Sequence, residues 1–185
     1  MSGQLSLRGR LLVAAPPLVD PNFDRTVVLM LEHGESGALG IVLNRPSTTT
    51  VQDVFPEWRK LVSPPAVAFA GGPVATDAVI ALARLRTPPV DGFTGVLDDL
   101  GTINLANDPL DLGGSLIALR VFAGYAGWAP FQLEAEMEQG AWFDVALQAD
   151  DPFAAAPDRL WRDVLRRQHG RLSVFSTFPE DASVN

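Results

Sequence analysis

Two apolar runs separated by a short glycine-bounded segment constrain the fold of this chain most strongly. The first run extends from Thr26 to Leu31 and consists of β-branched and large apolar side chains, and the second extends from Gly40 to Leu43. The segment between them has glycines at positions 34 and 37, which adopt positive φ without a Cβ clash and so reverse the chain. The stretch 20–46 therefore predicts a buried β-hairpin.

Polar residues mark both ends of this hairpin, and two aromatic residues follow a later apolar run. The aromatic pair comes directly after the run 116–122 and lies among glycines. Side chains of these kinds supply hydrogen-bonding and stacking groups to a ligand or to a partner protein. The residues predicted to form such a surface are Asp24, Arg25, Glu32, His33, Asn44, Arg45, Tyr125 and Trp128.

Several of these residues also have a structural interpretation. Asp24 and Arg25 are expected, before any functional role, to form a charged turn that holds the entrance of the strand. His33 follows an acid, but neighbouring side chains on a strand point to opposite faces, which favours a turn-stabilising histidine over a catalytic one. For Tyr125 and Trp128, the favoured interpretation is a corner between a strand and a helix that these two side chains pack.

The composition indicates one folded domain of the α+β class. The chain has 185 residues, of which 47% are hydrophobic and 19% are charged, and this length and composition suit a single globular domain. We expect a mainly antiparallel or mixed sheet with several short flanking helices, a short flexible start (about 1–7) and a polar tail (about 179–185). The residues expected in the core are Val27, Val28, Leu29, Leu31, Ile41, Val42, Leu43, Leu119, Val121 and Phe122.

Hydrophobic periodicity predicts the remaining elements. An amphipathic helix is expected over 76–85, and a second helix runs from Pro130 to a stop at Gly140. A final helix begins near Asp158 and places four apolar side chains on its inner face, and a strand is expected over 172–174.

Several kinds of chemistry lack the residues that they need. The chain contains no cysteine, which removes disulfides, thiolate nucleophiles and cysteine-ligated metals. Its two histidines are far apart in sequence, and it has neither a G-x-S-x-G elbow nor the spacing of a phosphate-binding loop. We expect no catalytic residue, no cofactor and no metal. This favours a non-enzymatic binding or regulatory protein, and the alternative is a small-ligand-binding protein or an enzyme that uses the polar hairpin ends.

The charge balance bears on the choice of partner. A net charge of −8 opposes non-specific attraction to nucleic acid, because Lys and Arg supply the contacts to phosphate. Five arginines between Arg159 and Arg171 form the basic cluster, most of them along one side of a helix. We expect this face to be solvated, with no tight direct nucleic-acid binding, and the partner to be an unknown protein or small ligand.

The sequence lacks a signal-peptide pattern and any apolar window long enough to span a bilayer. We therefore expect a cytoplasmic protein without membrane association, as a monomer or a weak homo-oligomer.

Motifs from about Gly9 to the region of Trp142 resemble the YqgE/AlgH family of bacterial proteins. They comprise Leu12–Pro16, Leu18, Asp20-Pro21, Phe23, Arg25–Val28, Glu32-His33, Gly37–Gly40, Asn44–Pro46, Gly71–Val74, Gly124–Trp128 and Gln132–Glu134. The resemblance implies a compact α+β domain in the bacterial cytosol and no particular reaction, and some members carry the label of transcriptional regulator. The family has glycine where this chain has Ala129 and Phe131.

Overall fold

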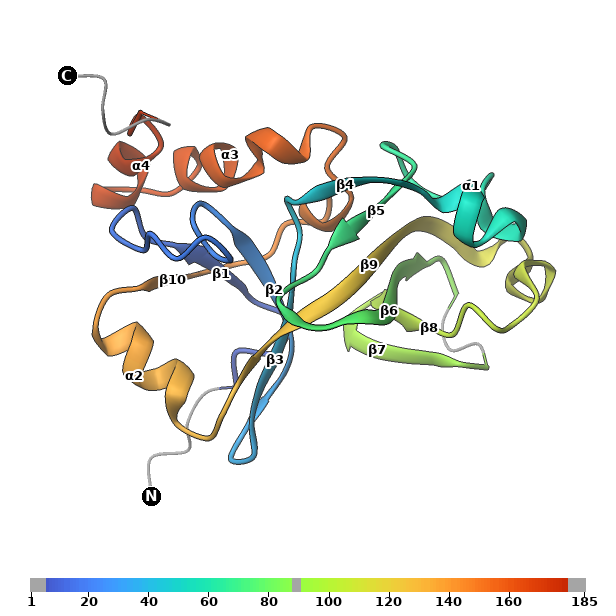
Figure 1. Ribbon diagram of the computed structural model, residues 1–185, viewed down its shortest axis with the longest axis horizontal. Coiled ribbons are helices and arrows are strands. Elements are labelled where there is room, and N and C mark those ends of the chain that lie inside the picture. The colour runs from blue at the N-terminus through green and yellow to red at the C-terminus, as the bar shows by residue number, and fades with distance from the viewer. Residues whose placement is uncertain (1–5, 88–90, 180–185) are drawn as a thin grey trace.

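The predicted hairpin lies at the centre of a curled sheet in the computed structural model (Figure 1). Its strands are β2 (Val27–Gly34) and β3 (Gly37–Val42), which pair in antiparallel orientation and are joined by a tight turn. Gly37 takes the expected positive φ, at 114°, whereas Gly34 does not. The hairpin prediction is therefore confirmed.

The structure describes residues 6–87 and 91–179, whose strands form one mainly antiparallel sheet. The main order is β10-β1-β2-β3-β9-β6-β8-β7, while β5 lies parallel to β9 and β4 lies antiparallel to β5. The further strands are β1 (Leu11–Ala14), β4 (Pro46–Thr50), β5 (Val67–Ala70), β6 (Val74–Leu85), β7 (Phe93–Leu97), β8 (Leu100–Ile103), β9 (Leu116–Trp128) and β10 (Trp142–Val145).

Strand β9 is long enough to join two halves of the sheet. Its first part pairs with β6 as far as Tyr125, and its last part pairs with β3 through Trp128. The predicted corner at these two aromatic residues is therefore wrong, because pairing with β3 keeps the backbone extended there. The chain turns later, at Phe131, whose φ of 63° is the left-handed conformation that glycine adopts without strain.

Two motif glycines let two backbone segments cross at very short range. A Cβ on Gly72 would lie 2.2 Å from the backbone of Tyr125, and a Cβ on Gly124 would lie 2.5 Å from the carbonyl oxygen of Gly72. No side chain fits at either position. The close approach of the segment between β5 and β6 to β9 thus accounts for both glycines.

Short helices cover both faces of the sheet. Helix α3 (Leu160–Arg166) lies over one face, and its four inward residues, predicted from periodicity, are all buried. Helix α2 (Gln132–Glu138) covers the opposite face, as Figure 1 shows. The other helical segments are α1 (Val51–Val54), α4 (Arg171–Phe175) and the 3₁₀ turns Pro56–Trp58, Pro109–Ser115, Asp151–Phe153 and Pro157–Arg159.

The segment 76–85, predicted to be a helix, belongs to strand β6. Its even-numbered residues Ile80 and Leu82 pack into one apolar cluster, while the odd-numbered Ala81 and Ala83 pack into another. A strand that is buried on both faces shows no alternation of polar and apolar residues, so periodicity does not distinguish it from a helix. Pairing with both β8 and β9 makes this segment a strand.

The segment 172–174, predicted to be a strand, lies in helix α4. No neighbouring strand among the described residues offers it a ladder, and the helix packs instead against α3. Phe175 stacks on Phe143, with ring centroids 5.5 Å apart, which anchors α4 to β10.

The ten predicted core residues are all buried, and the most accessible, Leu31, is 6% exposed. Leu7, which lies in the start of the chain predicted to be flexible, is also buried. Residues 1–5 and 180–185, the rest of the predicted start and tail, lie outside the described residues. The predicted α+β class is confirmed: the chain forms a single domain with a curled, mainly antiparallel sheet.

Candidate functional site

The predicted site residues at the base of the hairpin form a hydrogen-bonded entrance. The Asn44 side chain bridges two strands, since its Oδ1 accepts from the Val27 N–H at 2.9 Å and its Nδ2 donates to the Arg25 carbonyl at 2.8 Å. The Arg45 guanidinium donates to the carbonyl oxygen of Asp24 at 2.7 Å. Asn44 and Arg45 therefore hold the chain as it enters β2.

Asp24 and Arg25 were expected to hold the entrance of the strand as a charged turn, but their charged side chains do not do so. Within the described residues, no ion pair joins these two side chains. Arg25 has a φ of 52°, and its guanidinium lies 4.9 Å from the centroid of the Trp161 ring, beyond the hairpin. Backbone carbonyls held by Asn44 and Arg45 stabilise the entrance instead, which leaves the Arg25 side chain directed toward α3.

At the other end of the hairpin, His33 has a structural role. The His33 side chain is 3% exposed, its Nδ1 accepts from the Leu7 N–H at 3.1 Å, and its Nε2 lies 3.0 Å from Glu134 Oε1. A ring whose Nδ1 accepts carries its proton on Nε2, which donates to the carboxylate. His33 thus ties the N-terminal segment to α2, and exposed Glu32 does not join this network.

Tyr125 and Trp128, the two predicted site residues of β9, pack within the fold. Trp128 and Trp142 both donate their indole N–H to Glu136 Oε2 at 2.9 Å, and Phe23 packs against both rings. Tyr125 packs against the apolar cluster beneath α3. The eight predicted residues therefore occupy separate places and do not line one cavity.

One of the eight, Arg25, lines a polar cavity that the sequence did not predict. Its volume is about 680 Å³, and it is formed by the entrance of β2 and the start of α3. Buried Trp161 contributes to its floor, with its indole N–H donating to the Ala14 carbonyl at 2.9 Å. We call this space the arginine cavity, and its lining residues are Arg25, Asp158, Arg159, Trp161, Arg162, Asp163 and Arg166.

The guanidinium groups of the arginine cavity have different partners. Arg25 donates to the carbonyl oxygens of Phe178, at 3.4 Å, and of Pro179. Arg162 donates to the Ser176 carbonyl at 3.0 Å, and Arg166 forms an exposed ion pair with Asp163 at 3.0 Å. Four arginines and two aspartates give the lining a formal charge of +2, in a chain of net charge −8.

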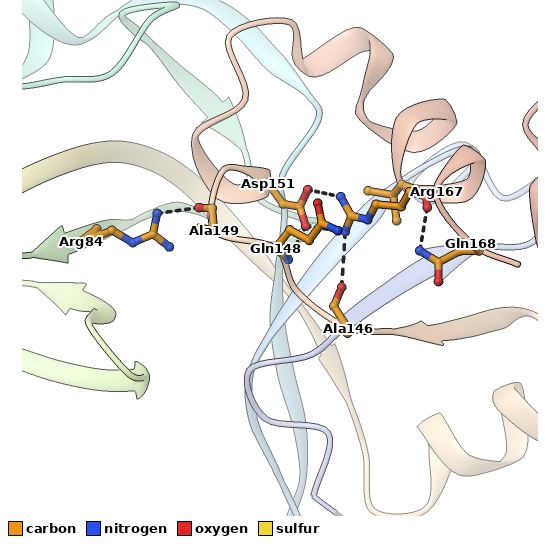
Figure 2. Close-up of polar contacts among 8 residues, drawn as sticks. Arg84, Ala146, Gln148, Ala149, Asp151, Arg167 and Gln168 are labelled. Atoms are coloured by element: carbon orange, nitrogen blue, oxygen red, sulfur yellow. Dashed lines mark hydrogen bonds and ion pairs between the residues drawn. The ribbon is translucent and has the colours of Figure 1, made fainter.

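The other arginines of the predicted basic cluster do not line this cavity. Arg167 points the other way and binds the buried Asp151 carboxylate through two hydrogen bonds of 2.6 Å, as Figure 2 shows. Arg171 lies on α4 and is exposed. The predicted solvated arginine face is therefore divided into a cavity lining, a buried ion pair and an exposed residue.

The sequence indicated the α3 side of the arginine cavity but not the contribution of Arg25. The spacing of Arg159, Arg162 and Arg166 by three and four residues indicates one helix face. The contribution of Arg25 had no sequence signal, because it depends on a left-handed backbone and on a contact across more than a hundred residues.

Residues 6–87 and 91–179 contain no group of three or more His, Asp or Glu side chains placed to hold a metal ion. Within the same ranges, no helix has both the length and the apolar character needed to cross a bilayer.

Comparisons with known proteins agree on the family. The AlgH-like family model matches residues 11–173. A UPF0301 protein of Streptomyces avermitilis is 47% identical, over 97% of this chain and 96% of its own length. A crystal structure of a Corynebacterium diphtheriae protein, 35% identical, has a TM-score of 0.89 and covers 96% of this chain and 95% of that one. The solution structure of AlgH from Pseudomonas aeruginosa, 29% identical, has a TM-score of 0.70 and covers 98% and 99%. This chain therefore belongs to the AlgH-like family.

Proposed function

We propose that this protein is a non-enzymatic binding protein that recognises a small anionic ligand in the arginine cavity. The observation that carries the proposal is that four arginines, from two distant segments, line one cavity of about 680 Å³. A guanidinium donates to carboxylate or phosphate oxygens in a planar, often bidentate geometry, and such hydrogen bonds are about twice as strong as neutral ones.

The charge pattern favours a small ligand over duplex DNA. The positive lining is concave and belongs to a chain of net charge −8, so a long polyanion would meet repulsion outside the cavity. A small anion reaches the guanidinium groups without covering that surface. A regulatory role would then follow from ligand binding and not from direct reading of a promoter.

The two carboxylates narrow the chemistry of the ligand. Asp158 and Asp163 line the same cavity and repel a purely anionic molecule, but they accept hydrogen bonds from hydroxyl or amine groups. The lining therefore suits a compound that carries an anionic group beside such donors.

The lining residues favour binding over covalent catalysis. The described lining contains no serine, threonine, tyrosine, lysine or histidine, so it offers neither a hydroxyl or amine nucleophile nor an imidazole base, and of its two carboxylates Asp163 is paired with Arg166.

The test is calorimetric titration of inorganic phosphate, pyrophosphate and glycerol phosphate into the full chain and into Arg159→Gln. Arg159 lines the cavity and is exposed, and Arg171→Gln is the matched control from the same basic cluster. Loss of one charge-assisted contact, worth about 1.5–3 kcal/mol, weakens binding about tenfold or more.

Three results would count against the proposal. These are no saturable binding of any of the three anions, equal weakening by both variants, and submicromolar binding of a duplex that exceeds the affinity for the anions.

A further inference from the structure

A second cavity lies away from the arginine cavity, beneath β4 and α1, and has the opposite chemistry. Its volume is about 320 Å³, and its floor is made of small and branched apolar side chains of β5, β6 and β9, such as Ala68, Val79 and Ala123. Val51 and Phe55, at the two ends of α1, form the opposite wall. In Figure 1, β4 leads along the top of the molecule into α1, above β5 and β9. We call this space the apolar cavity.

Irregular strand pairing borders the apolar cavity on two sides. Strand β4 pairs with β5 at Pro46–Phe69 and Thr50–Val67, so residues 47–49 stand opposite Ala68 alone. Bulges of this kind direct side chains away from a regular ladder and are frequent beside binding sites.

The second irregularity lies in β6. This strand pairs with β9 at Val74–Tyr125 and Val79–Ala123, so residues 75–78 stand opposite Gly124 alone. Ala75 in this bulge has a φ of 43°, a left-handed conformation that is strained for alanine. Each bulge carries a hydroxyl group into the cavity lining: Thr49 from β4 and Thr76 from β6.

The lining is free of charge. Among the described residues, it contains no Asp, Glu, Lys, Arg or His, and its polar side chains are the hydroxyls of Ser47, Thr49 and Thr76. Two of the lining valines are unusually accessible, since Val54 is 50% exposed and Val79 is 45% exposed. A charged ligand would lose its hydration here without gaining a counter-charge, whereas an uncharged apolar one would cover both valines.

We propose that the apolar cavity binds a small, uncharged and mostly apolar molecule that carries one or two hydrogen-bonding groups. Its volume falls in the range of small-molecule sites, about 300–1,000 Å³, and its apolar floor with a few hydroxyls is the usual composition of such sites. The walls come from five elements, β4, α1, β5, β6 and β9, so several parts of the fold bound the space, as expected of a concave small-molecule site. This inference does not depend on the arginine cavity.

The first test is a fluorescence titration of the full chain with N-phenyl-1-naphthylamine, an uncharged aromatic dye. Ala123→Leu places a larger side chain in the floor, and Ala70→Leu fills the same cavity from an exposed position if the first variant folds poorly. The matched control is Ala118→Leu, because Ala118 lies on the same strand five residues away and points to the opposite face.

We expect saturable binding to the full chain and to the control, and affinity reduced about tenfold or more in a filled variant that keeps the wild-type melting temperature. Absence of saturable binding, or equal affinity in the control and the filled variants, would overturn the proposal.

A second titration tests the hydroxyl groups with 2-naphthol and naphthalene. The double variant Thr49→Val/Thr76→Val should weaken 2-naphthol several-fold and leave naphthalene unchanged, since it removes two hydroxyls at nearly constant shape. Sedimentation of the filled variants completes the test. If they change only the association state and not dye binding, a second copy of the chain occupies this surface and the proposal is wrong.

Discussion

Arginine side chains serve different purposes in two neighbouring regions of this molecule. Three arginines from outside the loop 146–154 hold that loop in place. Arg84 donates to the Ala149 carbonyl and Arg167 to the Asp151 carboxylate, as Figure 2 shows. Arg120 donates to the Pro152 and Ala154 carbonyls. In the arginine cavity, four arginines surround an open space. The arginines of the first region are held by protein acceptors, whereas in the arginine cavity three of the four arginines bond protein acceptors and also line a cavity.

Arg120 is the extreme case of the structural kind. It is 0% exposed, and its guanidinium donates to three carbonyl oxygens and lies 4.4 Å from the centroid of the Phe69 ring. Among the described residues, no carboxylate pairs with it. Burial lowers the pKa of Arg120 to about 10, so the group is still charged at neutral pH.

We expect the largest loss of stability when this buried cation is removed. Arg120→Met keeps the approximate length of the side chain but leaves three carbonyl oxygens without their donor, and we expect the free energy of unfolding to fall by about 3–5 kcal/mol. Urea denaturation measures this change. Arg86→Met is the control, because Arg86 is exposed, and it should stay within about 0.5 kcal/mol of wild type. Equal stability of the Arg120 variant and wild type would remove Arg120 from the structural group.

The lowered pKa of Arg120 determines how the stability difference between wild type and Arg120→Met depends on pH. The folded pKa of about 10 lies below the ordinary value of an arginine, so this group makes the unfolded chain bind more protons than the folded chain only from about pH 10 upward. The stability difference between wild type and Arg120→Met should therefore stay constant from pH 6 to 9 and increase above about pH 10. Denaturation at three pH values checks this, and a steep change below pH 9 would contradict it.

Breaking the buried ion pair of the loop should have the next largest effect. Arg167→Gln leaves the Asp151 carboxylate buried without its cation, which should lower the free energy of unfolding by about 1–3 kcal/mol. Thermal and urea melts measure the loss, with Arg171→Gln as the exposed control on α4. If Arg167→Gln and Arg171→Gln are equally stable, Arg167 is not a structural arginine, and the proposed contrast with the cavity arginines is wrong.

Arg25 lines the arginine cavity and also contacts the fold, so its substitution should lower the free energy of unfolding less than that of Arg167 and more than that of Arg159. Arg25→Gln removes the contact with the Trp161 ring and the exposed hydrogen bonds to the Phe178 and Pro179 carbonyls. A cation–π contact at a partly exposed site contributes about 0.5–1 kcal/mol, and a typical hydrogen bond about 0.5–1.5 kcal/mol. We therefore expect a small loss of stability together with a large loss of anion binding. A loss of several kcal/mol with no change in binding would place Arg25 among the structural arginines.

The smallest effect on stability should come from Arg159. Its side chain is exposed and lines the arginine cavity, so Arg159→Gln should change the free energy of unfolding by less than about 0.5 kcal/mol. A urea melt, read beside the anion titration of the same variant, separates stability from binding. A destabilisation as large as that of Arg167→Gln would show that the cavity arginines are structural too.

The sequence predicted those parts of the fold that local patterns determine. The central hairpin, its buried core and the inward face of α3 follow from alternation and from helical spacing. Strand β6 and the extended Gly124–Trp128 segment were missed, because pairing with distant strands overrode local propensity. Helix α4 was missed for a similar reason, since its packing against α3 and Phe143 has no local signal.

The site was predicted less well than the fold. His33, Asn44 and Trp128 are polar or aromatic residues at strand ends, but their hydrogen bonds are made within the fold. A sequence shows that a side chain can form such bonds and does not show whether the protein itself supplies the partners. Arg25, which was predicted as part of a polar surface, lines a cavity whose other lining residues lie more than a hundred residues away in the sequence.

The four tryptophans permit the most direct test of the arginine cavity. Trp161 lies beneath Arg25, whereas Trp58, Trp128 and Trp142 belong to other apolar clusters. Fluorine NMR of the protein labelled with 5-fluorotryptophan, titrated with pyrophosphate, should show a saturable shift of the Trp161 resonance and constant positions for the other three. Arg25→Gln should weaken that titration. No shift at Trp161, or larger shifts at Trp128 and Trp142, would contradict the account.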